Sequence, residues 1–190
     1  MARYRYEGDK RREIVFPLGG IGAGAIGLLI AALCKKRGAG DVIVVDFAPA
    51  RLEMAKALGA SHIINPQDGD VLAQIARITG SGADKTFECV GVQDTFYQAM
   101  MSLRKNGLAT IIGIFEKPEV TIPATRFITH EIKVQGSQSY CWDFPVAISM
   151  VKEVGAARLI THSFPLDELQ KALECCLDRD SGAIKVVVKP

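Results

Sequence analysis

Residues 22–27 read GAGAIG, and they are followed by an apolar run and then by DVIVVD at residues 41–46. In this order the first glycine permits a tight turn after a strand, Gly24 lets the backbone approach a pyrophosphate, and Gly27 lets the next helix pack on a sheet. Asp46 follows Gly24 by 22 residues, near the separation of about 20 residues expected for an acid that accepts hydrogen bonds from an adenosine ribose. The stretch therefore predicts a dinucleotide-binding turn. The alternative is a glycine-rich turn that only closes a strand–helix unit.

The segment before this turn is the least regular part of the predicted fold. Residues 13–21, EIVFPLGGI, should form the first, central strand. However, Pro17 cannot donate a hydrogen bond to a ladder, and the glycines after it leave nothing to pack. The glycine run also permits a second register of the turn, Gly20-x-Gly22-x-x-Ala25. We keep the register that begins at Gly22 because it places the helix and the ribose-binding acid correctly.

Strands and helices alternate through most of the chain. Beyond the first strand, the sequence predicts strands at residues 42–46, 61–65, 84–90, 108–114 and 131–136. It predicts helices at residues 25–37, 49–58, 71–79, 93–105 and 143–154. This alternation is typical of a parallel sheet with right-handed crossovers. We therefore expect an α/β fold, a Rossmann doubly wound six-stranded parallel sheet with helices on both faces and a ligand crevice at the carboxyl ends of the strands.

The two ends of the chain lie outside this pattern. Residues 1–12 carry five basic residues and no apolar periodicity, which favours a solvated tail. The last part contains a helix that begins near Pro165 and an apolar strand at residues 183–190. The predicted organisation is a basic tail (1–12), a dinucleotide-binding domain (13–158) and a C-terminal helix–strand segment (159–190).

The composition is that of a globular protein. The 190 residues are 48% hydrophobic and 23% charged, and the formal net charge of +2 favours neither nucleic acid nor an anionic membrane as a partner. The five cysteines show no CxxC spacing, which indicates reduced thiols and neither a disulfide framework nor a zinc site. No apolar run reaches about 18 residues, and no signal peptide opens the chain. We therefore expect a cytoplasmic protein.

Seven phrases of the chain resemble, in order, the medium-chain, zinc-type alcohol and polyol dehydrogenases. They are GAGAIGLL (22–29), VIVVD (42–46), ARLEMAKALGASHIIN (50–65), ADKTFECVG (83–91), GLATIIGI (107–114), ITHEIKVQGS (128–137) and LITHSFPLDELQKAL (159–173). The phrase DFPVAISM (143–150) is closer to the polyol and butanediol branch than to the alcohol branch. The resemblance implies an oxidoreductase that transfers a hydride between a secondary alcohol and NAD.

The resemblance also implies a set of residues that contact NAD. In chain order they are Gly22, Gly24, Ala25, Ile26, Gly27, Asp46, Arg51, Val90, Gly91, Ile112, Gly113 and Ile114. The glycine turn would hold the pyrophosphate, and Asp46 the adenosine ribose. Residues 90–91 would line the crevice, and residues 112–114 would lie beside the nicotinamide. Asp46 favours NAD over NADP because a 2′-phosphate would meet a carboxylate. Arg51 weakens this preference slightly if it lies near the adenine side; the alternative is a solvated arginine.

Two features depart from the family. Its catalytic domain, which supplies the zinc ligands and the proton relay, precedes the cofactor domain and has no counterpart in this sequence. We therefore expect no catalytic residue and no metal ligand here, and we interpret the three scattered histidines as structural. The opening FPLGGIGAG (16–24) instead resembles a glucosylceramidase-like glycoside hydrolase family, which suggests a rearranged or fused reading frame.

The resemblance also implies partners. In the family, the residues that match 159–190 pack on the catalytic domain. The edge strand at 131–136 is the family's dimer contact, and an exposed edge strand is a template for pairing, so we expect a homodimer.

The leading interpretation is the NAD-binding portion of a zinc-dependent alcohol or polyol dehydrogenase that is inactive alone. One alternative is a stand-alone NAD-binding or redox-sensing module. Another is a non-functional dehydrogenase remnant, whose first strand no longer supports binding.

Overall fold

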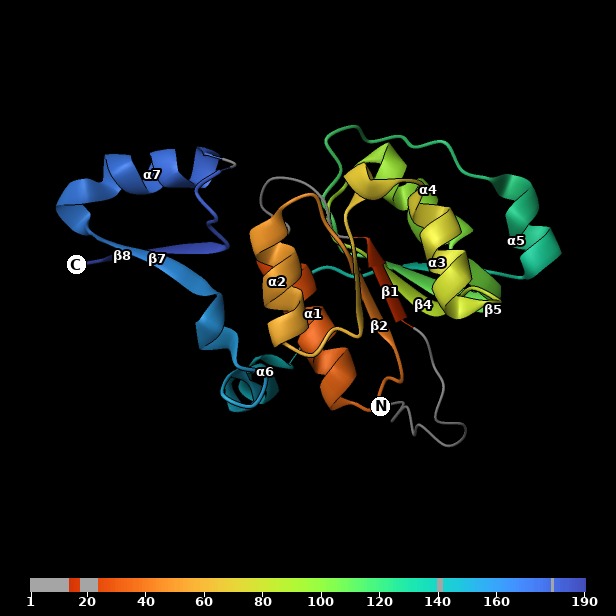
Figure 1. The fold of residues 1–190 in the computed structure, drawn as a ribbon, viewed down its shortest axis with the longest axis horizontal. Coiled ribbons are helices and arrows are strands. Elements are labelled where there is room, and N and C mark those ends of the chain that lie inside the picture. Colours follow the sequence, from red (N-terminus) through yellow and green to blue (C-terminus); the bar gives the residue numbers. More distant parts are fainter. Residues whose placement is uncertain (1–13, 18–23, 140–141, 179) are drawn as a thin grey trace.

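The structure is a computed structural model that describes residues 14–17, 24–139, 142–178 and 180–190. Within these residues, six parallel strands form one sheet in the order β3-β2-β1-β4-β5-β6 (Figure 1). The strands are β1 (Ile14–Pro17), β2 (Val42–Val45), β3 (His62–Ile64), β4 (Ala83–Glu88), β5 (Leu103–Ile111) and β6 (Lys133–Gly136). The strand order reverses between β1 and β4, as in doubly wound folds. The predicted α/β class, a parallel sheet with helices on both faces, is confirmed.

Helices cover the two faces of the sheet (Figure 1). On one face lie α1 (Gly24–Lys36) and α2 (Pro49–Ala57), and on the other lie α3 (Val71–Thr79) and α4 (Gln93–Met101). The sequence VIVV of β2 is apolar at every position because the strand is covered on both sides. Val42 and Val44 pack with α1 and α2, whereas Ile43 and Val45 pack with α3. The core is therefore divided into layers by the sheet.

The first strand is central despite its proline. β1 pairs with both β2 and β4, and Pro17 is its last residue, in register with Val45. A proline at the end of a strand removes one donor without interrupting the ladder. The described strand lies within the predicted span of 13–21, and residue 13 and residues 18–21 of that span lie outside the described residues.

The boundary between α4 and β5 differs from the prediction. The sequence indicated a helix to residue 105 and a strand from residue 108, but the helix ends at Met101 and β5 begins at Leu103. Leu103 is buried in a cluster with Phe96, and its backbone is in register with Ala83 of β4. Pairing with the neighbouring strand therefore ends the helix at Met101, before the chain reaches Asn106 and Gly107, a residue pair that is typical of turns.

A helix that the sequence did not predict, α5 (Ala124–His130), follows the loop after β5. Its Arg126 guanidinium donates to the backbone carbonyls of Met101 and Leu103, at 2.9 and 2.8 Å. Phe127 packs against the cluster between α4 and β5. These partners lie 25 and 23 positions earlier in the chain, so no local pattern could have indicated them.

The C-terminal residues form a strand–helix–strand unit beside the main sheet (Figure 1). Its elements are β7 (Ile160–Pro165), α7 (Leu169–Leu177) and β8 (Lys185–Lys189). The two strands pair in parallel as a separate sheet, and β7 was not predicted. Short 3₁₀ turns complete the fold: η1 (Pro66–Asp68), η2 (Ala156–Leu159) and η3 (Leu166–Glu168).

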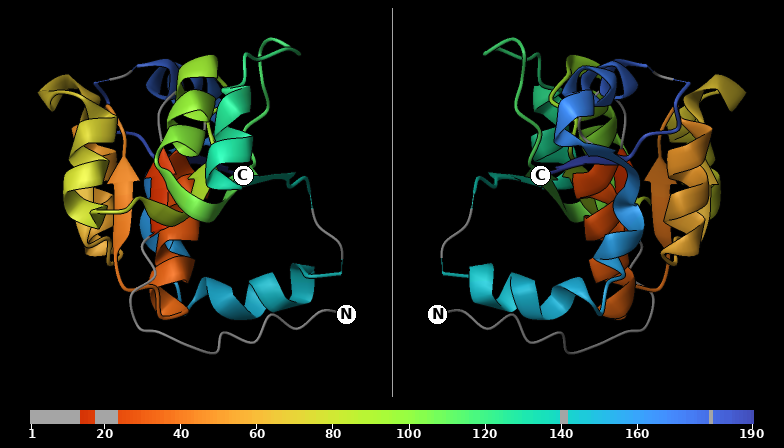
Figure 2. Two further views of the ribbon diagram at one scale, coloured as in Figure 1. Left: turned by 90° about the vertical axis from the view of Figure 1, so that its right-hand side faces the viewer. Right: turned by 90° about the vertical axis from the view of Figure 1, so that its left-hand side faces the viewer.

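Two helices present apolar side chains to solvent. α6 (Phe144–Val151) has no buried residue and projects from the body of the molecule (Figure 2). At α7 the exposed side chains form a leucine stripe, which consists of Leu166, Leu169, Leu173 and Leu177. Of the helices that the structure describes, none combines the length and apolarity that a membrane span requires. The exposed apolar side chains of α6 and the leucine stripe are both candidate surfaces for protein contacts.

Two core cysteines are predicted to resist alkylation. Burial raises the pKa of Cys34 to about 11 and that of Cys89 to about 12, and only the thiolate is reactive. In the native chain at a pH of about 8, iodoacetamide should label the exposed Cys176 before Cys34 and Cys89, as measured by peptide mass spectrometry. Both core cysteines should react in guanidinium chloride. Equal native labelling rates for Cys89 and Cys176 would contradict the burial described here.

Candidate dinucleotide site

The candidate site lies at the carboxyl ends of the central strands. In a doubly wound sheet, ligands bind where the strand order reverses, which here is between β1 and β4. Three segments reach this edge: the start of α1, the end of β2, and the paired ends of β4 and β5. Most of the residues predicted from the sequence come from these segments, so the fold brings them to one edge; Arg51 comes from α2, and Gly22 lies outside the described residues.

The glycine turn is described in part. Gly22 lies outside the described residues, whereas Gly24 is the first residue of α1 and is buried. An ideal Cβ on Gly24 would lie 2.6 Å from Arg51 Nε. Gly27 is buried on the helix, and the side chain of Ile26 in the first turn is about half exposed. The helix N-terminus, with N–H groups that lack an intrahelical acceptor, therefore opens at the crevice without a side chain at its first position.

Asp46 is a buried carboxylate directly after β2, with 1% of its surface exposed. Its Oδ1 accepts a hydrogen bond from the Ala48 N–H at 2.8 Å. Its Oδ2 accepts no hydrogen bond from the described residues, although Arg51 Nη1 lies 3.5 Å away. Burial raises the pKa of Asp46 above its ordinary value, while the Ala48 N–H and the Arg51 charge act in the opposite direction. A buried oxygen with spare acceptor capacity fits a ligand that brings hydroxyl donors.

The ends of β4 and β5 are in direct contact. Gly91 has a φ of 89°, and a Cβ there would collide with the Ile114 carbonyl oxygen. A Cβ on Gly113 would collide with the Gly91 nitrogen. Both positions therefore require glycine, one for its backbone conformation and both for space. Val90 is partly buried in this wall of the crevice, and the side chain of Ile114 is 87% exposed at its rim.

The C-terminal unit also reaches the site beside α1 and α2, which the sequence did not indicate. A cavity of about 620 Å³ is lined by Gly24 and Ile26 of α1, by Arg51 of α2, and by Cys176 and Lys185 of the C-terminal unit. Lys185 comes more than a hundred residues after the motif in the chain. Only the return of the C-terminal unit to α1 and α2 places its charge there.

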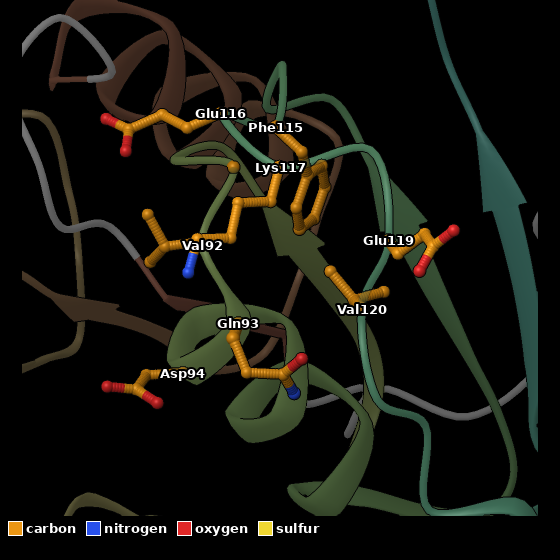
Figure 3. Close-up of a pocket in the computed structure, with 9 residues that line it drawn as sticks. Val92, Gln93, Asp94, Phe115, Glu116, Lys117, Glu119 and Val120 are labelled. Carbon is orange, nitrogen blue, oxygen red and sulfur yellow. The ribbon is translucent and has the colours of Figure 1, made fainter.

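A second cavity lies next to the β4–β5 wall (Figure 3). It has a volume of about 270 Å³, and its residues come from the start of α4 and from the loop after β5. The side-chain amide of Gln93 holds this loop at Thr121. Its Nε2 donates to the Thr121 carbonyl at 2.9 Å, and its Oε1 accepts from the Thr121 N–H at 2.7 Å.

A metal site is not formed by the residues that the structure describes. No group of three or more histidine, cysteine, aspartate or glutamate side chains lies close enough to hold an ion. His62 is in β3 beside Asp41, His130 ends α5 beside Arg126, and His162 is in β7. The described donor set therefore does not fit zinc, and we derive no chemical step through a metal.

Comparison with known proteins identifies the family. A family model described as zinc-binding dehydrogenase matches residues 25–153, more than half of the chain. The chain belongs to this family. The resemblance to the medium-chain, zinc-type dehydrogenases is thereby confirmed.

Two of the similar curated proteins come from Bacillus subtilis. A sorbitol dehydrogenase is 34% identical over 173 residues, which cover 90% of this chain and 49% of the relative. An (R,R)-butanediol dehydrogenase is 34% identical over 171 residues, which cover 89% and 49%. The chain therefore spans about half the length of the curated relatives it matches.

Solved structures show the same partial match. A 2R,3R-butanediol dehydrogenase from Bacillus subtilis aligns with a TM-score of 0.83 at 32% identity, over 94% of this chain and 51% of that chain. A protein from Sinorhizobium meliloti, described as a zinc-binding dehydrogenase bound to NADP, aligns with a TM-score of 0.83 at 29% identity, over 95% and 53%. Both structures support the assignment of the fold.

Proposed function

We propose that this chain is the NAD(H)-binding portion of an alcohol or polyol dehydrogenase of the zinc-dependent type. The observation that supports this most is the buried Asp46 carboxylate at the end of β2, together with the first turn of α1, where Gly24 carries no side chain and packs against Arg51. A helix N-terminus receives a pyrophosphate, and an acid at this distance receives an adenosine ribose.

Each side of the crevice has a separate task in this proposal. When bound, the nicotinamide accepts or donates the hydride, and the protein binds and orients it. Asp46 accepts hydrogen bonds from the ribose hydroxyls, and the N-terminus of α1 holds the pyrophosphate. The β4–β5 wall at residues 90–91 and 112–114 flanks the nicotinamide. The exposed side chain of Ile114 covers one side of the ring and excludes water from it.

The remaining chemistry belongs to a catalytic half of the kind that the family has. The leucine stripe supports this, because three exposed leucines on α7 and Leu166 in the preceding η3 turn are a surface that a second domain can bury. Zinc and the proton relay would come from that half, so the chain alone is expected to bind NAD and to catalyse nothing. A stand-alone redox-sensing module or a non-functional remnant is the competing function.

The proposal includes a homodimer formed through the edge of the sheet. All four residues of β6 are exposed, and β6 is the last strand of the sheet, so its outer edge is open to a second copy. The apolar helix α6 follows in the chain and would extend the contact. A cytoplasmic location is supported by the free thiols among the described cysteines.

Titration of the purified chain with NADH, followed by nicotinamide fluorescence, tests the cofactor proposal. We expect saturable binding in the micromolar to sub-millimolar range that ADP-ribose displaces, because ADP-ribose keeps the adenosine and pyrophosphate contacts. A folded chain that does not bind millimolar NADH would contradict the proposal and favour the remnant. Light scattering after size exclusion tests the dimer, and a monomer at high concentration would contradict that part alone.

A further inference from the structure

Glu88 is a fully buried carboxylate at the last residue of β4, in the middle of the cofactor edge of the sheet. Its exposed fraction is 0%, and it forms no ion pair among the described residues. Isolated buried carboxylates are costly unless hydrogen bonds compensate them. The sequence did not single out this residue, and the NAD contacts named above do not include it.

The carboxylate organises the turn between β4 and α4. One oxygen, Oε1, accepts from the N–H groups of Val90 and Gly91, both at 2.8 Å. The same oxygen accepts from the Thr95 hydroxyl at 2.7 Å, which reaches back from the first turn of α4. A single oxygen therefore fixes both crevice residues of the turn and ties them to the helix that follows.

The backbone of the same residue holds the neighbouring segment. The Glu88 carbonyl accepts from the N–H groups of Ile112 at 2.8 Å and of Gly113 at 3.0 Å. A Cβ on Gly113 or Gly91 would collide with the opposite segment. The segments at residues 90–91 and 112–114 are therefore in direct contact, without room for a side chain between them. Through these five donors, Glu88 is hydrogen-bonded both to the turn at residues 90–95 and to the segment that begins at Ile112.

We propose that Glu88 is a positioning residue for the nicotinamide half of the crevice. It acts through Val90 and Gly91, whose places it fixes against residues 112–114, and it does not contact the cofactor. This inference rests on the proposed function, since it assigns the β4–β5 wall to the nicotinamide. It implies that the nicotinamide contact and the adenosine contact are set by two different buried carboxylates, Glu88 and Asp46.

A comparison of NADH with ADP-ribose, which lacks the nicotinamide, tests the inference in the full chain. For Glu88→Ala we expect the Kd of NADH to rise about tenfold or more, the effect of losing hydrogen bonds that order a binding segment. The Kd of ADP-ribose should stay within about twofold, because the adenosine side is untouched. Glu88→Gln keeps an acceptor oxygen and should restore most of the NADH affinity. Amide exchange at Val90 and Gly91 should be faster in Glu88→Ala than in the native chain.

The matched control is Thr86→Val on the same strand. Thr86 is also fully buried, and its hydroxyl donates to the Ala99 carbonyl at 2.9 Å, away from the crevice. This variant should lose stability and keep both affinities. If Glu88→Ala does not fold, Thr95→Val removes one donor to the same oxygen and should show the selective loss at smaller amplitude.

The outcomes separate this inference from the proposed function. Failure of the native chain to bind either ligand would overturn the proposed function and, with it, the nicotinamide assignment. If the native chain binds both ligands, and the Glu88 and Thr95 variants weaken both equally or neither, the positioning role is overturned. A loss confined to NADH, restored by glutamine and absent from Thr86→Val, supports it.

Discussion

Asp46→Ala is expected to raise the Kd of NADH about 100-fold, which corresponds to losing one or two hydrogen bonds to a charged acceptor at about 1.5–3 kcal/mol each. The Kd of NADPH should change far less or fall. Removal of the carboxylate eliminates the charge that a 2′-phosphate would meet, and it leaves the Arg51 guanidinium, now 3.5 Å from Asp46 Oδ2, beside that phosphate. Fluorescence titration with both reduced cofactors measures the change in preference.

Two further variants control for lost structure. Asp46→Asn keeps an acceptor for the Ala48 N–H but removes the charge, so it should shift the preference with less destabilisation. Asp41→Ala lies at the opposite end of β2, near His62, and should leave both affinities unchanged. If NADH and NADPH weaken in parallel in the Asp46 variants, Asp46 does not select the cofactor.

Asp46 could be predicted from the sequence because the motif is defined by the number of residues between the glycine turn and the acid. The distance between a glycine turn and an acid follows from the length of one helix and one strand, and both elements are strongly apolar. Helix α3 was equally predictable, since Asp70 caps it with a hydrogen bond of 2.9 Å and Gly80 ends it. These boundaries are set by residues that are neighbours in the sequence, so they can be predicted from the sequence alone.

Tertiary contacts set the features that were missed. The helix α4 ends at Met101 because Leu103 pairs with β4, and α5 depends on carbonyls that Arg126 reaches across the fold. Lys185 lines the cavity beside α1 and α2 only because the C-terminal unit returns to these helices. In the sequence, Glu88 is an acidic residue near the end of a predicted strand, and nothing local distinguishes it. Its burial and its five hydrogen bonds result from the turn that the backbone makes around it.

Gly91→Ala is expected to destabilise the chain by about 2–5 kcal/mol and to abolish NADH binding. About 1–2 kcal/mol comes from a side chain at positive φ, since Gly91 has a φ of 89°. The rest is overpacking, which costs about 1–3 kcal/mol, because the added Cβ would collide with the Ile114 carbonyl oxygen. To relieve this contact the segments at residues 90–91 and 112–114 must separate, which would displace residues 112–114 from the proposed nicotinamide site. Urea denaturation and NADH titration measure the two effects.

Gly38→Ala distinguishes the backbone effect from the contact between the walls. Gly38 has nearly the same φ, 85°, but a Cβ there would meet nothing within 4 Å. It lies just past the C-terminal end of α1, at the opposite end of this helix from Gly24, so this variant should lose only about 1–2 kcal/mol and should bind NADH as the native chain does. Equal destabilisation of the two variants, with NADH binding retained in Gly91→Ala, would show that the β4–β5 contact is not needed to shape the site. A larger loss at Gly91 together with lost binding would assign the difference to the contact itself.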